Sequence, residues 1–487
     1  MDRVSKLKPA VSVVLLVLAT VFVAGALLTE LIFNKTIARS TAQIDVDRCE
    51  LMLRINDSLI SIGNLFLGPK EMDNTSESAK QLAKQALPLL ISAHSQNPND
   101  PVVVAKAMIV AQYLGEPGNE LLSSLKSMTG PKASALALPL ERIYGKGVIH
   151  QGESEKLAQI IDSLLPPSWY SDQARLALYK KAQQHELYLQ LEERLTIRSF
   201  VLFARILMIT VLGTLLSIGG VIVLIVQIFS RRPLTPPEEL AQIRAPANYG
   251  WLSVYAVFIA WLATQVACGV LAQPFVKGLS AGQIAVTGTA AIMALVYIVS
   301  NGPGLVYIYL FALRPHQLEF FDALKIRLRY GIRGPGKQLL AGFLAWMAAI
   351  PIMELAYYIS TKYLGSEGSN NPIIAIVTDA ARHESFSATL LFYITLGVLA
   401  PICEETMFRG FLYTYLRRYW GVLPCTLLSA AFFSVAHLDP GGFLPLFCLG
   451  SVFAIVLEKT KSIVPAMIAH ALWNSCTFTL VILLFGS

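Results

Sequence analysis

The sequence has 487 residues, of which 54% are hydrophobic and 15% are charged, and its mean hydropathy is +0.56. A soluble chain of this composition would leave much of its apolar surface in water, so the composition excludes a soluble protein and predicts a multi-pass membrane protein. The net charge of +7 does not indicate a nucleic-acid partner, because the basic residues gather beside the apolar stretches.

About nine apolar stretches are long enough to cross the ~30 Å hydrocarbon core of a membrane. They are residues 11–29, 206–226, 251–272, 284–313, 339–352, 390–415, 422–436, 443–457 and 463–485. The predicted fold class is therefore all-α: a polytopic membrane helical bundle with an inserted extramembrane helical domain.

Four regions are predicted along the chain. Residues 1–33 form an N-terminal membrane anchor, since the apolar run after the basic start is long for a cleaved signal peptide. Residues 34–197 form an extracytoplasmic helical domain, residues 198–338 contain membrane helices and basic cytoplasmic loops, and residues 339–487 form the last part of the bundle.

Basic residues set the predicted orientation through the positive-inside rule. With the N-terminus in the cytoplasm, the basic sites that also fall inside are Arg231, Arg232, the loop 314–337, Arg417, Arg418, Lys459 and Lys461. This pattern requires that residues 386–419 cross the membrane once, with a kink at Pro401. The predicted location is a bacterial cytoplasmic membrane with residues 34–197 outside.

Within residues 34–197, apolar residues recur at helical spacing in "AKQLAKQALPLLISAH" and "VVVAKAMIVAQYL". Gly- and Pro-rich breaks such as "NPNDP" and "GEPGN" separate short helices, which could stack as a repeat although no clean period is present. A last helix over residues 171–198 is expected to continue into the second span. This region is a candidate for binding a protein partner.

The stretch "SNGPG" at residues 300–304 interrupts an apolar span. Broken helices build some transport sites, but no paired ionisable residue or second broken span accompanies this one, which favours a simple proline kink.

Three charged residues follow the apolar run from residue 390. An ionised side chain in a membrane costs about 3 kcal/mol, so Glu404, Glu405 and Arg409 require partners or water. Glu405 and Arg409 have the favourable spacing for an ion pair on one helical face. Glu404 is rotated by about 100° from Glu405 and is left free for proton transfer.

Polar residues in the next spans reach a similar depth. At ~1.5 Å per residue, Glu404 and His437 both lie roughly 25 Å from the turn at Gly421, and His470 and Asn474 share one face of the last helix. Each histidine alone is more often a packing residue. Together, a carboxylate, two imidazoles and an amide can supply a base and the donors for an oxyanion.

The motifs "EETMFR", "FSVAH" and "HALWN" read in order as EExxxR, FxxxH and HxxxN. Over residues 339–485 the sequence resembles the CPBP family of intramembrane glutamate proteases, the CAAX protease and bacteriocin-processing group also called the Abi family. The resemblance implies that residues 339–487 form a CPBP-like intramembrane protease core, and that the protein is a metal-independent endopeptidase without cofactors. Its partners would be membrane lipid and a protein or peptide substrate at the membrane.

By this resemblance, Glu404 activates a water molecule with help from His437. His470 and Asn474 would stabilise the tetrahedral oxyanion, while Glu405 and Arg409 support the site. Residues 34–197 have no place in the family core, and a bacterial member need not meet a prenylated protein. The substrate therefore stays open.

Two other functions are compatible with the same sequence features. The Glu/His cluster could hold a catalytic zinc ion through His437, His470 and a glutamate, although no HExxH motif is present. Alternatively, the protein is a non-catalytic membrane scaffold or immunity-type protein that binds a partner through residues 34–197.

Overall fold

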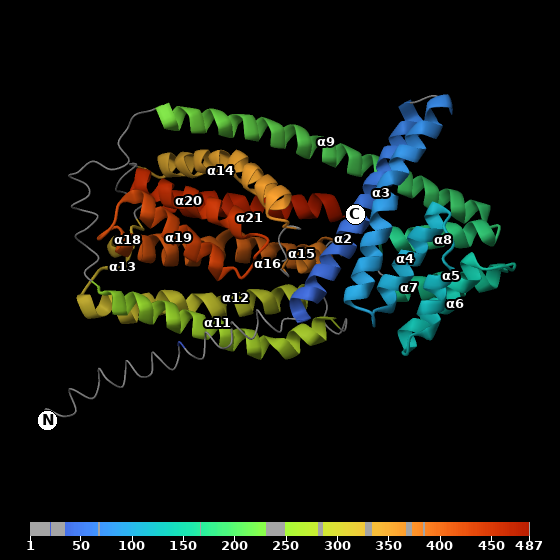
Figure 1. The fold of residues 1–487 in the computed structure, drawn as a ribbon, viewed down its shortest axis with the longest axis horizontal. Coiled ribbons are helices and arrows are strands. Elements are labelled where there is room, and N and C mark those ends of the chain that lie inside the picture. Colours follow the sequence, from blue (N-terminus) through green and yellow to red (C-terminus); the bar gives the residue numbers. More distant parts are fainter. Residues whose placement is uncertain are drawn as a thin grey trace. The chain divides into compact units, whose positions relative to one another are not determined.

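The computed structural model describes residues 20, 35–66, 69–165, 167–229, 249–280, 286–326, 334–366, 373–382 and 385–486. Every regular element among these residues is helical (Figure 1). The protein is an all-α multi-pass membrane bundle, as the composition predicts. The predicted anchor at residues 1–33 lies outside the described residues, except for Thr20.

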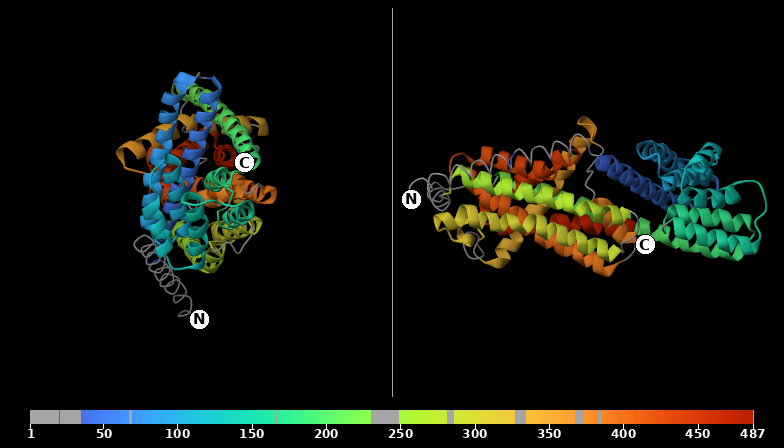
Figure 2. Two further views of the ribbon diagram at one scale, coloured as in Figure 1. Left: turned by 90° about the vertical axis from the view of Figure 1, so that its right-hand side faces the viewer. Right: turned by 90° about the horizontal axis from the view of Figure 1, so that it is seen from below.

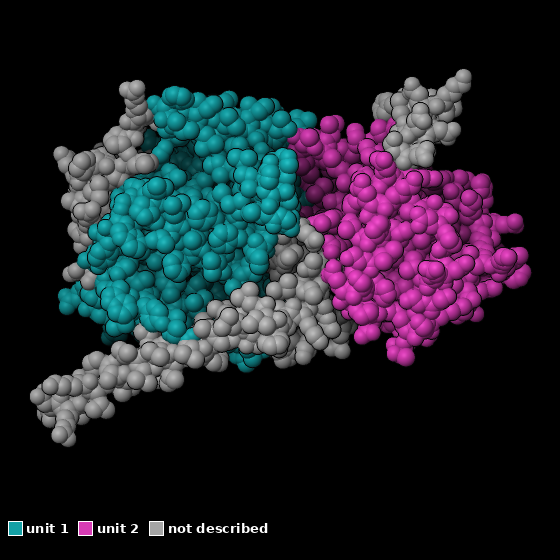
Figure 3. Space-filling model, viewed as in Figure 1, with its two compact units in different colours: residues 1–34, 211–371, 379–480 teal, residues 35–210, 372–378, 481–487 magenta. Residues whose placement is uncertain are grey.

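The chain divides into two compact units, coloured separately in Figure 3. Unit 1 contains the described residues of 211–371 and 379–480, and unit 2 those of 35–210, 372–378 and 481–487. The helices that lie wholly in unit 2 are α2 (Lys35–Phe66), α3 (Pro69–Gln96), α4 (Pro101–Leu114), α5 (Asn119–Ser127), α6 (Pro131–Tyr144), α7 (Gln151–Leu164) and α8 (Trp169–Lys181).

Local sequence explains where the helices of unit 2 begin and end. Asp100 caps α4 by accepting a hydrogen bond from the backbone N–H of Val102 at 2.9 Å, and Gly115 ends the helix with φ of 78°. Ser168 and Ser171 form a capping box at the start of α8. Consecutive helices pack on each other, and α8 also packs against α2, α4 and α6. These contacts close unit 2 around one core.

The helix predicted over residues 171–198 is interrupted, so that prediction was wrong. Helix α8 ends at Lys181, Gln183 adopts the left-handed conformation with φ of 56°, and α9 (His185–Phe229) then begins. Neither Gly nor Pro marks this break in the sequence. Helix α9 does continue through Arg198 into the second apolar stretch, as expected.

A half-buried acid of α2 links three helices of unit 2. Asp57 of α2 accepts hydrogen bonds from Trp169 Nε1 at 2.6 Å, from the Tyr113 hydroxyl at 3.0 Å and from Gln173 Nε2 at 3.3 Å. Burial is the largest influence on this carboxyl and raises its pKa, although the hydrogen bonds oppose the shift. Asp57 thus joins α2, α4 and α8.

The raised pKa of Asp57 predicts a pH dependence of stability. An acid whose pKa is higher in the folded state than in the unfolded state contributes its full stabilisation at a pH below the unfolded-state pKa. That stabilisation is lost as the pH rises through the folded-state pKa. We therefore expect Asp57→Asn to become more stable relative to wild type as the pH rises above about 4, the ordinary pKa of an aspartate. Thermal unfolding midpoints in detergent at several pH values measure this difference.

Glu153 supplies a control of opposite sign. Its exposed carboxylate accepts a hydrogen bond from Arg142, which lowers its pKa. The stability of Glu153→Gln should therefore fall relative to that of wild type as the pH rises. A difference between Asp57→Asn and wild type that stays constant with pH would contradict the role of burial.

Seven helices among the described residues are long and apolar enough to cross a membrane. They are His185–Phe229, Trp251–Ala272, Val286–His316, Pro335–Tyr363, Phe386–Leu416, Phe443–Thr460 and Val464–Phe485. The shorter apolar helix Val422–Ala436 accounts for one more of the predicted stretches, and residues 11–29 lie outside the described part of the chain.

Unit 1 is built from these apolar helices. Its main elements are α11 (Trp251–Ser280), α12 (Val286–Tyr307), α14 (Pro335–Tyr363), α16 (Phe386–Ile394), α17 (Ala400–Glu405), α19 (Val422–Ala436), α20 (Phe443–Thr460) and α21 (Val464–Phe485). Figures 1 and 2 show α11, α12, α14, α20 and α21 running along one common direction. Helix α12 passes Pro303 without a break, which agrees with a proline kink and not with a broken helix.

The segment Phe386–Leu416 is one continuous helical span, as the charge pattern requires. Two π-helical turns, Thr395–Leu399 and Thr406–Tyr413, flank Pro401 on α17. Wide turns of this kind weaken the regular backbone hydrogen bonds and often occur at functional sites. Side chains here bond to backbone carbonyls: Ser429 donates to Phe408 at 3.1 Å and Asn474 donates to Leu396 at 2.9 Å.

One predicted cytoplasmic charge has a second role. Arg417 is only 2% exposed, and its Nη2 donates to Oε1 of Glu458 at 3.0 Å. Tyr413 and Lys461 also donate to Glu458, at 3.0 and 3.3 Å. Arg417 therefore belongs to a buried ion-pair network between the end of the Phe386–Leu416 span and α20.

Candidate active site

The two carboxylate oxygens of Glu404 have different neighbours. Glu404 lies on α17, and its Oε1 accepts a hydrogen bond from the Tyr297 hydroxyl at 3.1 Å. Its Oε2 lies 3.8 Å from Nε2 of His437 and 3.9 Å from Nε2 of His470. The side chain is 16% exposed, so the acid is largely but not fully enclosed.

His437 follows directly after α19 and faces Glu404 with one ring nitrogen. Its Nδ1 lies 2.7 Å from the backbone oxygen of Phe433. Because a carbonyl oxygen only accepts hydrogen bonds, Nδ1 carries the proton, and Nε2 is an acceptor when the ring is neutral. The Phe433 ring packs edge-on against the imidazole at 4.7 Å and helps to fix its orientation.

His470 on α21 connects the two glutamates. Its Nδ1 lies 2.9 Å from Oε1 of Glu405, and its Nε2 is the atom near Glu404. The side chain is 4% exposed and stacks on Phe453, with ring centroids 5.1 Å apart. A carboxylate that accepts from Nδ1 fixes the tautomer, so Nε2 is the position at which this ring can gain or lose a proton.

Glu405 and Arg409 form the ion pair that their spacing predicts. Nη1 of Arg409 lies 3.0 Å from Oε1 of Glu405, and both side chains are fully buried. Nη2 of Arg409 donates to the backbone oxygen of Gly450 at 2.9 Å. Its guanidinium lies 4.4 Å from the ring centroid of Phe433 and 5.2 Å from that of Phe453, which adds cation–π attraction.

Gly450 on α20 allows this close approach. A Cβ added at this glycine would lie 3.0 Å from Nη2 of Arg409 and 3.2 Å from Cα of Ala430. The second contact is to the backbone of α19, which cannot move as readily as a side-chain end. The glycine therefore lets α20 present its carbonyl oxygen to the buried guanidinium.

The structure brings Glu404, His437 and His470 together, whereas Asn474 lies one turn further along α21. The amide Nδ2 of Asn474 donates to the backbone oxygen of Leu396, in the π-helical turn that precedes α17. One amide N–H is used in this way and the second is available to a ligand. Asn474 thus ties the last helix to the helix that carries Glu404.

Sequence reasoning missed Tyr297, which contacts Glu404 directly. A tyrosine inside an apolar span gives no signal of its own, because aromatic residues are ordinary packing residues there. The one hint is the nearby "SNGPG" stretch, since Ser300 and Asn301 are buried polar residues on the same helix.

The three facing atoms of the site are all hydrogen-bond acceptors when both rings are neutral. Oε2 of Glu404 has no hydrogen-bond donor among the described residues, and both imidazoles use Nδ1 for other partners. Such an arrangement requires a proton or a donor molecule at its centre. A water molecule suits it, because a water oxygen about 2.8 Å from each atom can bridge Oε2 of Glu404 and Nε2 of His437, which are 3.8 Å apart.

A zinc ion fits these separations less well. Ligand atoms about 2.0–2.1 Å from a tetrahedral zinc ion lie roughly 3.3 Å from each other, whereas Oε2 lies 3.8 and 3.9 Å from the two Nε2 atoms. No group of three or more His, Cys, Asp or Glu side chains in the described part of the chain has the geometry to hold a metal ion.

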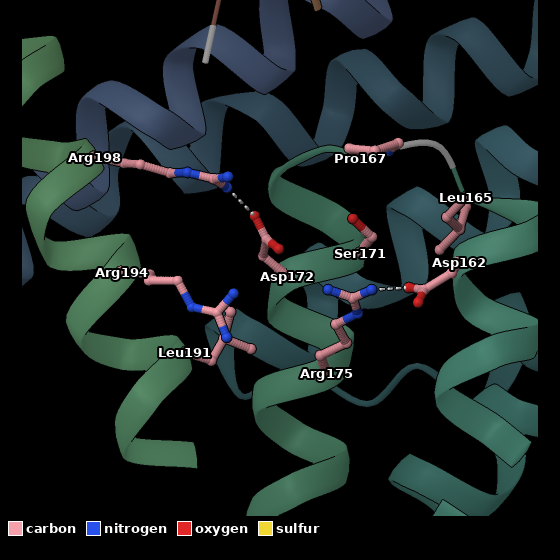
Figure 4. A pocket seen from close by; sticks show the side chains of 9 residues that line it. All are labelled: Asp162, Leu165, Pro167, Ser171, Asp172, Arg175, Leu191, Arg194 and Arg198. Carbon is pink, nitrogen blue, oxygen red and sulfur yellow. Dashed lines mark hydrogen bonds and ion pairs between the residues drawn. The ribbon is translucent and has the colours of Figure 1, made fainter. Parts of the chain in front are cut away.

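A second polar site is a cavity of about 310 Å³ in unit 2 (Figure 4). It is lined by Asp162, Leu165, Pro167, Ser171, Asp172, Arg175, Leu191, Arg194 and Arg198. Both acids in it are paired with arginine: Asp172 lies 3.5 Å from Arg198, and Asp162 contacts Arg175.

One family profile and one curated relative match parts of the chain. The profile of the family described as "Type II CAAX prenyl endopeptidase Rce1-like" matches residues 386–476. A relative from Bacillus subtilis (strain 168), named "Putative membrane peptidase YdiL", is 27% identical over 122 residues. That alignment covers 25% of this chain and 46% of the relative. No solved structure matches the chain significantly.

The matched segment contains all three motifs that led to the CPBP resemblance, and the resemblance is confirmed for this part of the chain. Together with the seven described helices that are long and apolar enough to cross a membrane, the matches support a membrane endopeptidase.

Proposed function

We propose that the protein is a metal-independent intramembrane glutamate endopeptidase that hydrolyses a peptide bond in or near the membrane. The observation that carries the proposal is the convergence of Oε2 of Glu404 with Nε2 of His437 and Nε2 of His470, at 3.8 and 3.9 Å. The family profile that matches residues 386–476 and the similarity to a relative named as a putative membrane peptidase support it.

In the proposed reaction, a water molecule donates hydrogen bonds to Oε2 of Glu404 and Nε2 of His437. As the water oxygen attacks the peptide carbonyl, one proton passes to Glu404 as general base. The carbonyl π bond opens and places a negative charge on the oxygen. Collapse of this tetrahedral intermediate breaks the C–N bond, and the proton moves from Glu404 to the leaving nitrogen, with His437 as its hydrogen-bonding partner.

His470 and Asn474 are proposed to stabilise the oxyanion. His470 can donate from Nε2 only when both ring nitrogens carry protons. The carboxylates of Glu404 and Glu405 face this ring from two sides and offset its positive charge. With His470 as an imidazolium, the cluster has two positive charges, on His470 and Arg409, and the two negative charges of the glutamates. Such a balance suits a site of low dielectric. The second amide N–H of Asn474 is the other proposed donor.

The wider setting belongs to the same proposal. Residues 34–197 lie outside a bacterial cytoplasmic membrane and bind a protein partner, and the substrate is a protein or peptide at the membrane.

Whether a prenyl group is needed is tested by comparing a farnesylated and an unmodified version of one quenched fluorescent peptide. Comparing membrane proteomes of wild-type and Glu404→Ala cells would identify the natural substrate as an uncleaved species.

Metal removal separates this mechanism from the zinc alternative. We expect peptide cleavage by protein purified in detergent to be unchanged after prolonged treatment with a chelator, because water activation relies on Glu404 and His437 alone. Metal analysis of the active sample is the accompanying measurement. Stoichiometric zinc together with activity that falls on chelation and returns with zinc would refute the glutamate mechanism.

A further inference from the structure

Tyr297 approaches the acid of the site from a helix outside the segment that matches known peptidases. Its hydroxyl donates to Oε1 of Glu404 at 3.1 Å, and α12 packs against α17. The family profile covers residues 386–476, and the three sequence motifs lie in the same segment. None of them assigns a role to this tyrosine.

A chain of polar side chains fixes the position of Tyr297. One turn further along α12, Nδ2 of Asn301 donates to the backbone oxygen of Tyr297 at 3.3 Å and to Oγ of Ser300 at 3.0 Å. Oδ1 of Asn301 accepts from Nε2 of Gln265 on α11 at 2.9 Å. Such hydrogen bonds between membrane helices fix how one helix is rotated against the other.

The contact with Tyr297 determines which oxygen of Glu404 faces the imidazoles. The terminal torsion of a glutamate side chain is broad, so a free carboxylate would sample many orientations. A hydrogen bond to Oε1 restricts this rotation and leaves Oε2 directed at His437 and His470. Positioning a reacting group in this way lowers the barrier to reaction.

We propose that Tyr297 is a positioning residue, which orients the Glu404 carboxylate so that Oε2 acts on the water molecule that Glu404 and His437 activate. The inference rests on the proposed hydrolytic function and adds to it. It assigns α12, outside the matched segment, a direct part in building the site.

Tyr297→Phe tests the role of the hydroxyl, because the change keeps the ring and removes only the donor. With a farnesylated quenched peptide as probe, kcat should fall about 10- to 100-fold while KM stays unchanged. Tyr307→Phe is the matched control: it removes a hydroxyl from the same helix, but one bonded to Thr264 at 2.9 Å. This control should keep the wild-type kcat.

Infrared difference spectra give a measurement that does not depend on turnover. Tyr297→Phe should shift the carboxylate stretching band of wild type and produce no such shift in a Glu404→Gln background. Equal kcat values for Tyr297→Phe and Tyr307→Phe, in a protein whose cleavage requires Glu404, would overturn this inference alone. Unchanged cleavage by Glu404→Gln would overturn the proposed function, and this inference with it, even if the band shift is seen.

Discussion

Glu404→Gln is expected to lower kcat for peptide cleavage by at least about 1,000-fold, because an amide cannot take the proton of the attacking water. The change keeps the size of the side chain and one oxygen, so the hydrogen bond from Tyr297 can be retained. The unfolding midpoint in detergent should therefore stay close to that of wild type. Cleavage of the farnesylated quenched peptide by purified protein is the measurement.

Glu354 offers a matched control for this change. It is another glutamate on an apolar helix, α14, and its Oε2 accepts a hydrogen bond from Ser217 at 2.7 Å. Glu354→Gln should leave cleavage unchanged. Full activity in Glu404→Gln would contradict the mechanism. A cellular phenotype that survives Glu404→Gln but is lost on deletion of residues 40–190 would favour the scaffold or immunity-type function instead.

Apolar length predicts most of the membrane helices because the need to cross hydrocarbon acts on each span separately. The second stretch was expected at residues 206–226, yet it belongs to a helix that begins at His185. Charged residues such as Arg194 and Arg198 do not stop a helix, so composition marks where the apolar part begins and not where the helix begins. The break at Gln183 was missed because no Gly or Pro marks it in the sequence.

Contacts within one helix were easier to predict than contacts between helices. The pair Glu405 and Arg409 follows from spacing on one face, and counting residues from a turn places Glu404 and His437 at one depth. Counting cannot give the rotation of one helix against another. The bond between His470 and Glu405 and the bond between Tyr297 and Glu404 both depend on that rotation, and the sequence alone indicated neither.

Arg409→Met is expected to lower the free energy of unfolding by about 3–5 kcal/mol, because it leaves Glu405 as a buried charge without its cation. The fully buried guanidinium also donates to Gly450 and packs between Phe433 and Phe453. Loss of the cation should thus disturb the α19–α20 contact as well. The unfolding transition of purified protein in detergent, followed by circular dichroism, measures the change.

A second substitution shows whether the unpaired charge causes the loss. Adding Glu405→Gln to Arg409→Met removes the carboxylate that has lost its cation, so the double variant should recover part of the lost stability. A double-mutant cycle measures this recovery. The exposed pair of Arg142 and Glu153 is the control, and Arg142→Met should have a much smaller effect because water screens that pair. If Arg409→Met and Arg142→Met destabilise equally, burial of the ion pair does not stabilise the core of the site.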